Sequence, residues 1–147
     1  MIQGDIGGDN IEAIKARIKN TPVPGGIKYN SYMQSYEWQK ECSDGQVSGM
    51  PDGNKRLEAI TMELTGELNS QYDIYYRVYV KDWGWMDWAQ NGEPAGSSGY
   101  GKSILALDTR LVQKERQLLV TGNSHIRRQI EWWPTIRMCR VMAGRQK

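Results

Sequence analysis

The chain has no phenylalanine, one histidine and two cysteines, and it has no apolar run long enough to cross a membrane. Without that run we expect no membrane insertion. The chain also contains no Cys-x-x-Cys or His-x-x-x-His spacing, so we expect no metal site, and we expect no cofactor. His125 lacks the flanking motif of a nucleophilic triad, and we expect no enzyme. Carboxylates that could pair for sugar hydrolysis are nevertheless present, at Asp44, Glu58, Asp82 and Asp87.

Because phenylalanine is missing, the aromatic content consists of six tryptophans and eight tyrosines. Both residue types carry a polar tip and suit partly wetted surfaces. This bias reflects either compositional drift or a surface that contacts a ligand.

The charge is distributed unevenly. Residues 110–147 hold nine Lys or Arg against two acidic residues, a net +7, whereas the preceding residues hold ten against 15, a net −5. The basic end could meet an anionic polymer, such as wall teichoic acid or nucleic acid, or could simply be solvated.

A segment of the chain recurs after about 47 positions. Nine residues of the first copy, residues 27–66, return in the second copy, residues 74–113, among them Gly45 as Gly92 and Gly49 as Gly96. The other seven are Ile27, Tyr29, Tyr32, Trp38, Lys55, Ala59 and Leu64, which return as Ile74, Tyr76, Tyr79, Trp85, Lys102, Ala106 and Leu111. Such a repeat decides the fold.

The two ends of the chain resemble halves of a third copy. Residues 1–20 match the back half of a repeat, and residues 122–147, with Trp133 aligned to Trp85, form a degenerate front half. We therefore expect one closed pseudo-three-fold domain over residues 1–147. Cys42 and Cys139 then fall in different lobes, too far apart for a disulfide, so we expect two free thiols.

Each copy begins with a period-two pattern that predicts a strand, with Ile74, Tyr76 and Val78 on one side and Tyr75, Arg77 and Tyr79 on the other. Asp44-Gly45 and Asn91-Gly92 predict tight primed turns that close hairpins. The last stretch of each copy fits helical and strand spacing alike, and we predict a strand. The fold class is therefore all-β, of β-prism or β-trefoil type.

The repeat also matches a known pattern of tryptophans, turns and glycines. The second copy carries Gly84-Trp85, Trp88, Asn91-Gly92, an Ala-Gly-Ser-Ser-Gly run from residue 95, and Lys102. The first copy carries Trp38, Asp44-Gly45, Ser48-Gly49 and the run Lys55-Arg56-Leu57-Glu58-Ala59-Ile60. These motifs resemble the clostridial hydrophobic W (ChW) repeat. Departures occur at Glu37, Lys40 and Leu105, which replace a Gly, the second Trp and a Glu of that pattern.

The resemblance implies an exported or cell-surface protein of a Gram-positive bacterium or its phage, and binding to a cell-surface or wall glycan. Self-association is a further expectation, as in a virion or surface-layer component, whereas nucleic-acid binding is not expected. A phosphate-loop pattern, Gly96-Ser97-Ser98-Gly99-Tyr100-Gly101-Lys102-Ser103, is explained by the repeat glycines, because no buried parallel strand precedes it.

Indole faces pack well against sugar rings. Asp accepts hydrogen bonds from sugar hydroxyls, and Asn both accepts and donates them. We expect Trp38, Trp85 and Trp133 to form the central core of the three lobes. Trp83 and Trp88 lack Trp counterparts in the first copy, so they are the predicted ligand platforms. The remaining predicted glycan-binding residues are Asp87, Asn91, Tyr36 and Asp44.

Overall fold

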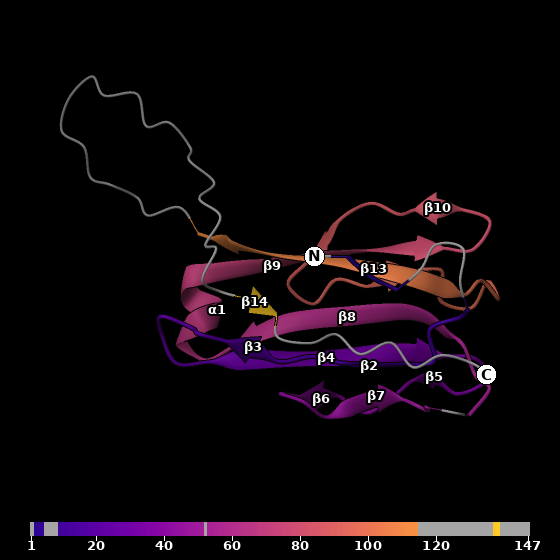
Figure 1. Ribbon diagram of the computed structural model, residues 1–147, viewed down its shortest axis with the longest axis horizontal. Helices are drawn as coiled ribbons and strands as arrows, with labels where there is room; N and C mark the ends of the chain where they lie inside the picture. Colours follow the sequence, from indigo (N-terminus) through magenta and orange to yellow (C-terminus); the bar gives the residue numbers. More distant parts are fainter. Residues whose placement is uncertain (1, 5–8, 52, 115–136, 139–147) are drawn as a thin grey trace, which may run out of the picture.

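The computed structural model describes residues 2–4, 9–51, 53–114 and 137–138, and in this part the fold is all-β with one short helix (Figure 1). The first strands are β1 (Ile2–Gly4), β2 (Ala13–Lys15), β3 (Ile18–Lys19), β4 (Gly26–Met33), β5 (Glu37–Trp38), β6 (Cys42–Ser43), β7 (Val47–Gly49) and β8 (Leu57–Thr65). After helix α1 (Glu67–Gln71) come β9 (Tyr72–Val80), β10 (Gly84–Trp85), β11 (Ala89–Gln90), β12 (Ala95–Gly96), β13 (Ile104–Gln113) and β14 (Arg137–Met138).

The two copies build two antiparallel sheets of the same design. In the first copy β4 pairs with β8, β5 and β6, and in the second β9 pairs with β13, β10 and β11. The registers agree, because Ile27 lies opposite Leu64 and Ile74 lies opposite Leu111. Figure 1 shows the β9–β13 sheet above the β4–β8 sheet, with α1 joining them at one end.

The final stretch of each copy is a strand, as predicted. In β8 the side chains of Ile60, Met62 and Leu64 are buried, and those between them are partly exposed. The period-two pattern outweighs the helical spacing because these residues must extend the sheet begun by β4, where the backbone finds its hydrogen-bond partners.

The predicted primed turns are confirmed. Asp44 and Gly45 have φ of 34° and 89°, and Asn91 and Gly92 have 45° and 90°, the positive values that such a turn requires. The predicted hairpins are wrong, however. After the turn the chain leaves its own sheet, and β7 pairs with β2 while β12 pairs with β8.

Each copy thus contributes a short glycine-containing segment to another copy. Gly49 lies opposite Ala13 and Gly96 opposite Ala59, and in the same way Gly4 of β1 lies opposite Ala106. All three glycines have positive φ, and a Cβ on any of them would lie 2.2–2.4 Å from a carbonyl oxygen of the partner strand. Backbone hydrogen bonds also link equivalent positions, from Ile11 to Ile104 (2.9 Å) and from Leu57 to Ile11 (2.8 Å).

Near the other end of the chain, β14 pairs with β3. Met138 lies opposite Ile18, the position that Ile27 takes opposite Leu64 in the first copy. This register differs from the predicted alignment of Trp133 with Trp85, which puts residue 122 at that position. Trp133 and Cys139 themselves lie outside the described residues.

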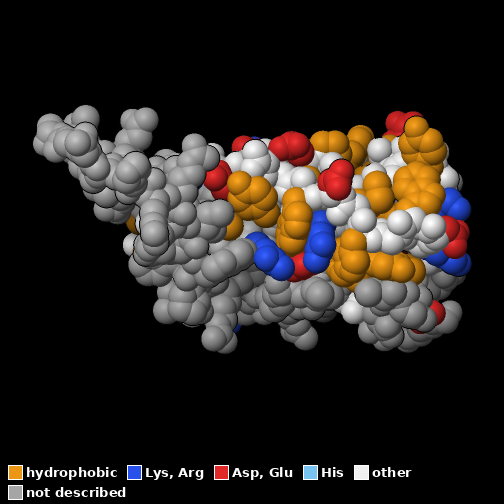
Figure 2. Space-filling model, turned by 90° about the horizontal axis from the view of Figure 1, so that it is seen from above, with side chains coloured by type: hydrophobic (Ala, Val, Ile, Leu, Met, Phe, Trp, Pro, Cys, Tyr) orange, Lys and Arg blue, Asp and Glu red, His pale blue; other side chains and the backbone are white. Residues whose placement is uncertain are grey.

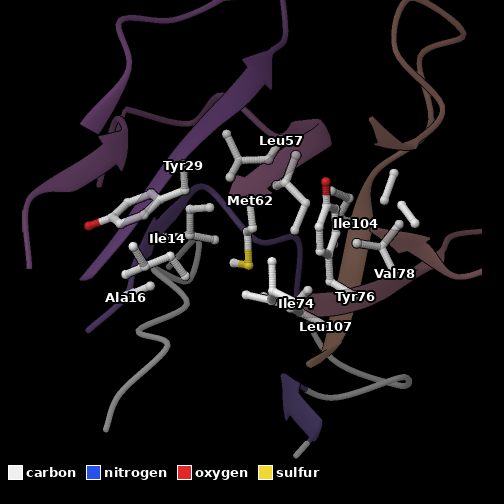
Figure 3. Close-up of a cluster of buried hydrophobic side chains, with 14 of the residues drawn as sticks. Ile14, Ala16, Tyr29, Leu57, Met62, Ile74, Tyr76, Val78, Ile104 and Leu107 are labelled. Carbon is white, nitrogen blue, oxygen red and sulfur yellow. The ribbon is translucent and has the colours of Figure 1, made fainter. Parts of the chain in front are cut away.

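The core lies between the sheets and contains no tryptophan among the described residues. Figure 3 shows Ile14, Met62 and Ile74 converging between the rings of Tyr29 and Tyr76. The hydroxyl groups of the two tyrosines donate hydrogen bonds to the carbonyl oxygens of Gln46 and Glu93. Burial raises the pKa of Tyr29, and it raises the pKa of Tyr76 to about 12.

The predicted core role of Trp38 and Trp85 is wrong. Trp38 is 40% exposed and Trp85 is half-buried. Strand parity is the reason, because Trp38 lies opposite Tyr32 and Trp85 opposite Tyr79, and both tyrosines alternate with buried neighbours and so face outward.

Candidate binding face

The outer face of each sheet carries a tyrosine–tryptophan pair. The rings of Tyr32 and Trp38 lie 5.6 Å apart at 83°, and those of Tyr79 and Trp85 lie 5.6 Å apart at 85°. Edge-to-face contact of this kind adds about 1 kcal/mol to the burial of the rings. Since the pair recurs with the same geometry, it belongs to the framework of the repeat.

On the second copy only, arginines extend this pair into a stack, which we call the Trp–Arg ladder (Trp85, Arg77, Trp88 and Arg110). The Arg77 guanidinium lies 4.6 Å from the ring centres of both Trp85 and Trp88, and that of Arg110 lies 4.8 Å from the centre of Trp88. These distances are those of cation–π contacts. Figure 2 shows the face from above, with basic side chains alternating with hydrophobic ones.

A buried carboxylate anchors the ladder. Asp108 lies opposite Arg77 in the β9–β13 register and its side chain is 3% exposed. Its Oδ2 accepts hydrogen bonds from Nε and Nη2 of Arg77 at 3.4 and 3.3 Å and lies 3.8 Å from Nη2 of Arg110. Asp108 therefore helps to hold the Arg77 guanidinium between the two indoles.

The first copy has the same backbone without a ladder. Register places Asn30, Glu41 and Glu63 where the second copy has Arg77, Trp88 and Arg110, and Thr61 stands for Asp108. The counterpart of Trp88 is thus Glu41, not Lys40 as the sequence alignment predicts. Lys28 bridges Glu41 and Glu63, at 3.8 and 3.4 Å.

A second aromatic cluster lies beyond the end of β9. Trp83 and Tyr100, 45% and 73% exposed, meet edge-on with ring centres 5.6 Å apart. Beside them, the Nζ of Lys102 lies 3.0 Å from Oδ2 of Asp82. Only Trp83 of this cluster is a predicted site residue, and no motif in the sequence indicates that Tyr100 meets it.

Tyr100 and Lys102 of this cluster belong to the phosphate-loop look-alike, residues 96–103. The segment runs from β12 into β13, so strands stand on both sides and no helix follows. Its Gly101 N–H donates to Oε1 of Glu58 at 2.8 Å, and the Ser97 hydroxyl donates to the carbonyl of Lys102 at 2.9 Å. The Gly101–Glu58 hydrogen bond holds the loop on the neighbouring copy, and the Ser97–Lys102 hydrogen bond closes the loop on itself.

The other predicted site residues are spread over the molecule. Asp44 and Asn91 are structural, because their Oδ1 atoms accept hydrogen bonds from the backbone of Ile27 (2.9 Å) and Ile74 (3.1 Å). Tyr36 is exposed on the first copy and Asp87 is exposed beside the ladder. Trp88 is 38% exposed, but its ring already contacts two guanidinium groups.

Metal and membrane sites are not found in the described part of the chain. No group of three or more His, Cys, Asp or Glu side chains there could hold a metal ion. No helix there is long and apolar enough to span a membrane. Cys42 is a free, half-buried thiol whose Sγ lies 3.4 Å from the carbonyl oxygen of Val47.

The arrangement defines a class of all-β repeat proteins whose sheets carry an outward tyrosine–tryptophan pair. Comparison with known families assigns the repeat: the model of the family Clostridial hydrophobic W matches residues 32–66 and again residues 79–113. The chain thus carries two Clostridial hydrophobic W repeats. No curated protein and no solved structure showed a significant match.

Proposed function

We propose that the protein is a non-enzymatic module that binds a cell-surface or cell-wall glycan. The observation that carries this proposal is the number of large aromatic side chains held at the surface. Five of them are 38–73% exposed, namely Tyr36, Trp38, Trp83, Trp88 and Tyr100. Clusters of exposed aromatic side chains mark interaction sites. Indole and phenol rings offer flat apolar faces to the C–H groups of sugars.

Within this set, the pair Trp83–Tyr100 is the proposed stacking platform. Its rings meet edge-on, so the larger faces are not stacked against each other. The Asp82–Lys102 ion pair beside it supplies an acceptor and donors for sugar hydroxyls. Trp88 contributes through the ladder, whereas Asp44 and Asn91 act indirectly by holding the turns.

For the architecture we propose a three-lobed β-prism. The equivalent contacts of Gly4, Gly49 and Gly96, and the hydrogen bonds that join Ile11 to its equivalents, support three-fold pseudosymmetry. A trefoil is built around a closed barrel, and the described sheets are open. The module would act outside the cell, on the surface or in a virion, as exported ChW proteins do.

Alanine substitution of Trp83 tests the function. Binding of the monomer to a glycan array and to purified Gram-positive cell walls would be measured for the wild type, Trp83→Ala and a control, Met50→Ala. Met50 is a comparably exposed apolar residue of the first copy, 42% against 45% for Trp83. We expect Trp83→Ala to weaken binding about tenfold or more, since anchoring aromatics dominate binding energies, and Met50→Ala to bind like the wild type.

The competing function is assembly, in which the aromatics contact other protein copies. A wild type that binds no glycan and instead self-associates with concentration in analytical ultracentrifugation would replace the glycan-binding proposal with that one. Equal losses in Trp83→Ala and Met50→Ala would also contradict the platform.

A further inference from the structure

We propose that the Trp–Arg ladder selects an acidic glycan, one whose chain carries phosphate or carboxylate groups. This inference rests on the proposed glycan binding and specifies its ligand. The ladder comprises two basic and two aromatic side chains on one sheet face, where guanidinium centres lie 4.6–4.8 Å from indole centres.

The repeat provides an internal comparison that separates framework from function. The tyrosine–tryptophan pair, the primed turn and the strand register occur in both copies. Arg77, Trp88 and Arg110 occur in the second copy alone, and the first copy forms the same sheet with Asn30, Glu41 and Glu63 in their places. The fold therefore does not require the ladder.

A guanidinium that stacks on an indole does not use its N–H donors in that contact. A guanidinium that lies on an indole uses its face, while its five N–H donors point outward in its plane. Asp108 engages Nε and Nη2 of Arg77, so the two N–H groups of Nη1 are not used by Asp108. Arg110 is 42% exposed. Held in place by the rings, both groups are preorganised for a phosphate or carboxylate, with little side-chain entropy left to lose.

Charge distinguishes the two faces. The ladder itself holds two cations, Arg77 and Arg110, against one carboxylate, Asp108, which is buried beneath it. Around it, Lys114 pairs with Asp73 at 3.7 Å and Asp87 is exposed. The first copy exposes Lys28 against Glu41 and Glu63, a net negative charge. An anionic chain is attracted to the ladder and repelled by the equivalent face.

A polysaccharide fits this surface better than a bare anion. Trp88 and Trp83 are 38% and 45% exposed on the same copy, so sugar rings can contact aromatic surface while their acidic groups reach the arginines. Neutral glycans would gain only the aromatic part of this interaction.

The test compares polymers and matched variants of the full chain. Affinities would be measured by tryptophan fluorescence for wall teichoic acid (phosphate), polygalacturonate (carboxylate) and dextran (neutral). The variants are Arg110→Gln, Arg110→Glu and the control Lys28→Gln. Lys28 occupies the first copy's outer face and is exposed to a similar degree, 35% against 42%. Circular dichroism would check that each variant folds.

We expect at least one acidic polymer to bind more tightly than dextran, and the preferred polymer to identify the anionic group. Arg110→Gln should weaken that binding about tenfold, the usual effect of removing a charged hydrogen-bond donor. Arg110→Glu should weaken it further, and Lys28→Gln should leave it unchanged.

Four results would overturn the inference. Dextran binding equal to that of the acidic polymers, or wild-type affinity in Arg110→Glu, would leave glycan binding intact but remove the ladder's role. Duplex DNA that competes as well as teichoic acid would show a general polyanion surface. Absence of binding to every polymer, including cell walls, would instead refute the proposed function itself.

Discussion

At the scale of single residues, Tyr79 and Trp85 illustrate how a large aromatic can be structural without being buried. The pair recurs as Tyr32 and Trp38 with nearly the same ring angle, 85° and 83°. Each pair covers the outer face of its own sheet, while buried tyrosines such as Tyr29 and Tyr76 fill the core.

This placement predicts a modest effect of removing either tryptophan. Trp38→Ala and Trp85→Ala should each lower the free energy of unfolding by about 1–2 kcal/mol, as for partly exposed aromatic contacts. Urea denaturation of both variants measures this. A loss of about 3–5 kcal/mol, usual for a core tryptophan, would contradict the observed exposure.

The sequence predicted from strand alternation that Arg77 and Tyr79 lie on the same side of their strand, but it could not place Trp85 and Trp88 on that side. Those residues follow a turn, and the strand pairing beyond it decides which side they take. Trp85 lies opposite Tyr79, and Trp88 directly precedes Ala89, which lies opposite Tyr76. The ladder also needs Asp108 and Arg110, which lie on β13, about 30 residues from Arg77. No local pattern brings these side chains together.

At the scale of elements, the turns were predictable because Asp-Gly and Asn-Gly favour positive φ locally. The strand with which the chain pairs after each turn was not predictable, because that strand belongs to another copy. Segments β7 and β12 cross to that copy at a glycine, and there the backbones approach too closely for a side chain.

Two glycines of the second copy separate close approach from backbone conformation. A Cβ on Gly96 (φ 128°) would lie 2.2 Å from the carbonyl oxygen of Glu58, whereas one on Gly84 (φ 84°) would lie 4.0 Å from the Tyr79 ring. We expect Gly96→Ala to lower the free energy of unfolding by more than about 3 kcal/mol. Gly84→Ala should lower it by about 1–2 kcal/mol, because only the positive φ is then unfavourable. Equal melting temperatures of the two variants would contradict the close approach of the backbones at Gly96 and Glu58.

At the scale of the whole molecule, the N-terminal partial copy is part of the core. Ile11, Ile14 and Ala16 are at most 2% exposed, and β2 receives β7 of the first copy. The sequence predicted this half-copy because residues 8–14 match residues 54–60. The match of the opposite end was too weak to set a register.

Removal of residues 1–20 should therefore abolish cooperative unfolding, because it strips buried side chains and leaves strand edges without partners. Removal of residues 1–8 alone takes β1 but keeps Ile11, so it should lower the melting temperature and retain one sharp transition. Calorimetry compares the two. A chain lacking residues 1–20 that melts like the wild type would refute the three-lobed architecture.

The crossing segments also bear on how such a chain could arise. Each 47-residue unit offers one segment to a neighbour and needs one from another, in the order β12 to β8, β7 to β2 and β1 to β13. A unit on its own would have an open edge and an unplaced segment, and three identical units would satisfy each other in a ring. A small gene encoding one unit could thus have yielded a stable trimer before duplication joined the units in one chain. Within one chain the units need not be identical, and the ladder occurs in the second copy but not in the first.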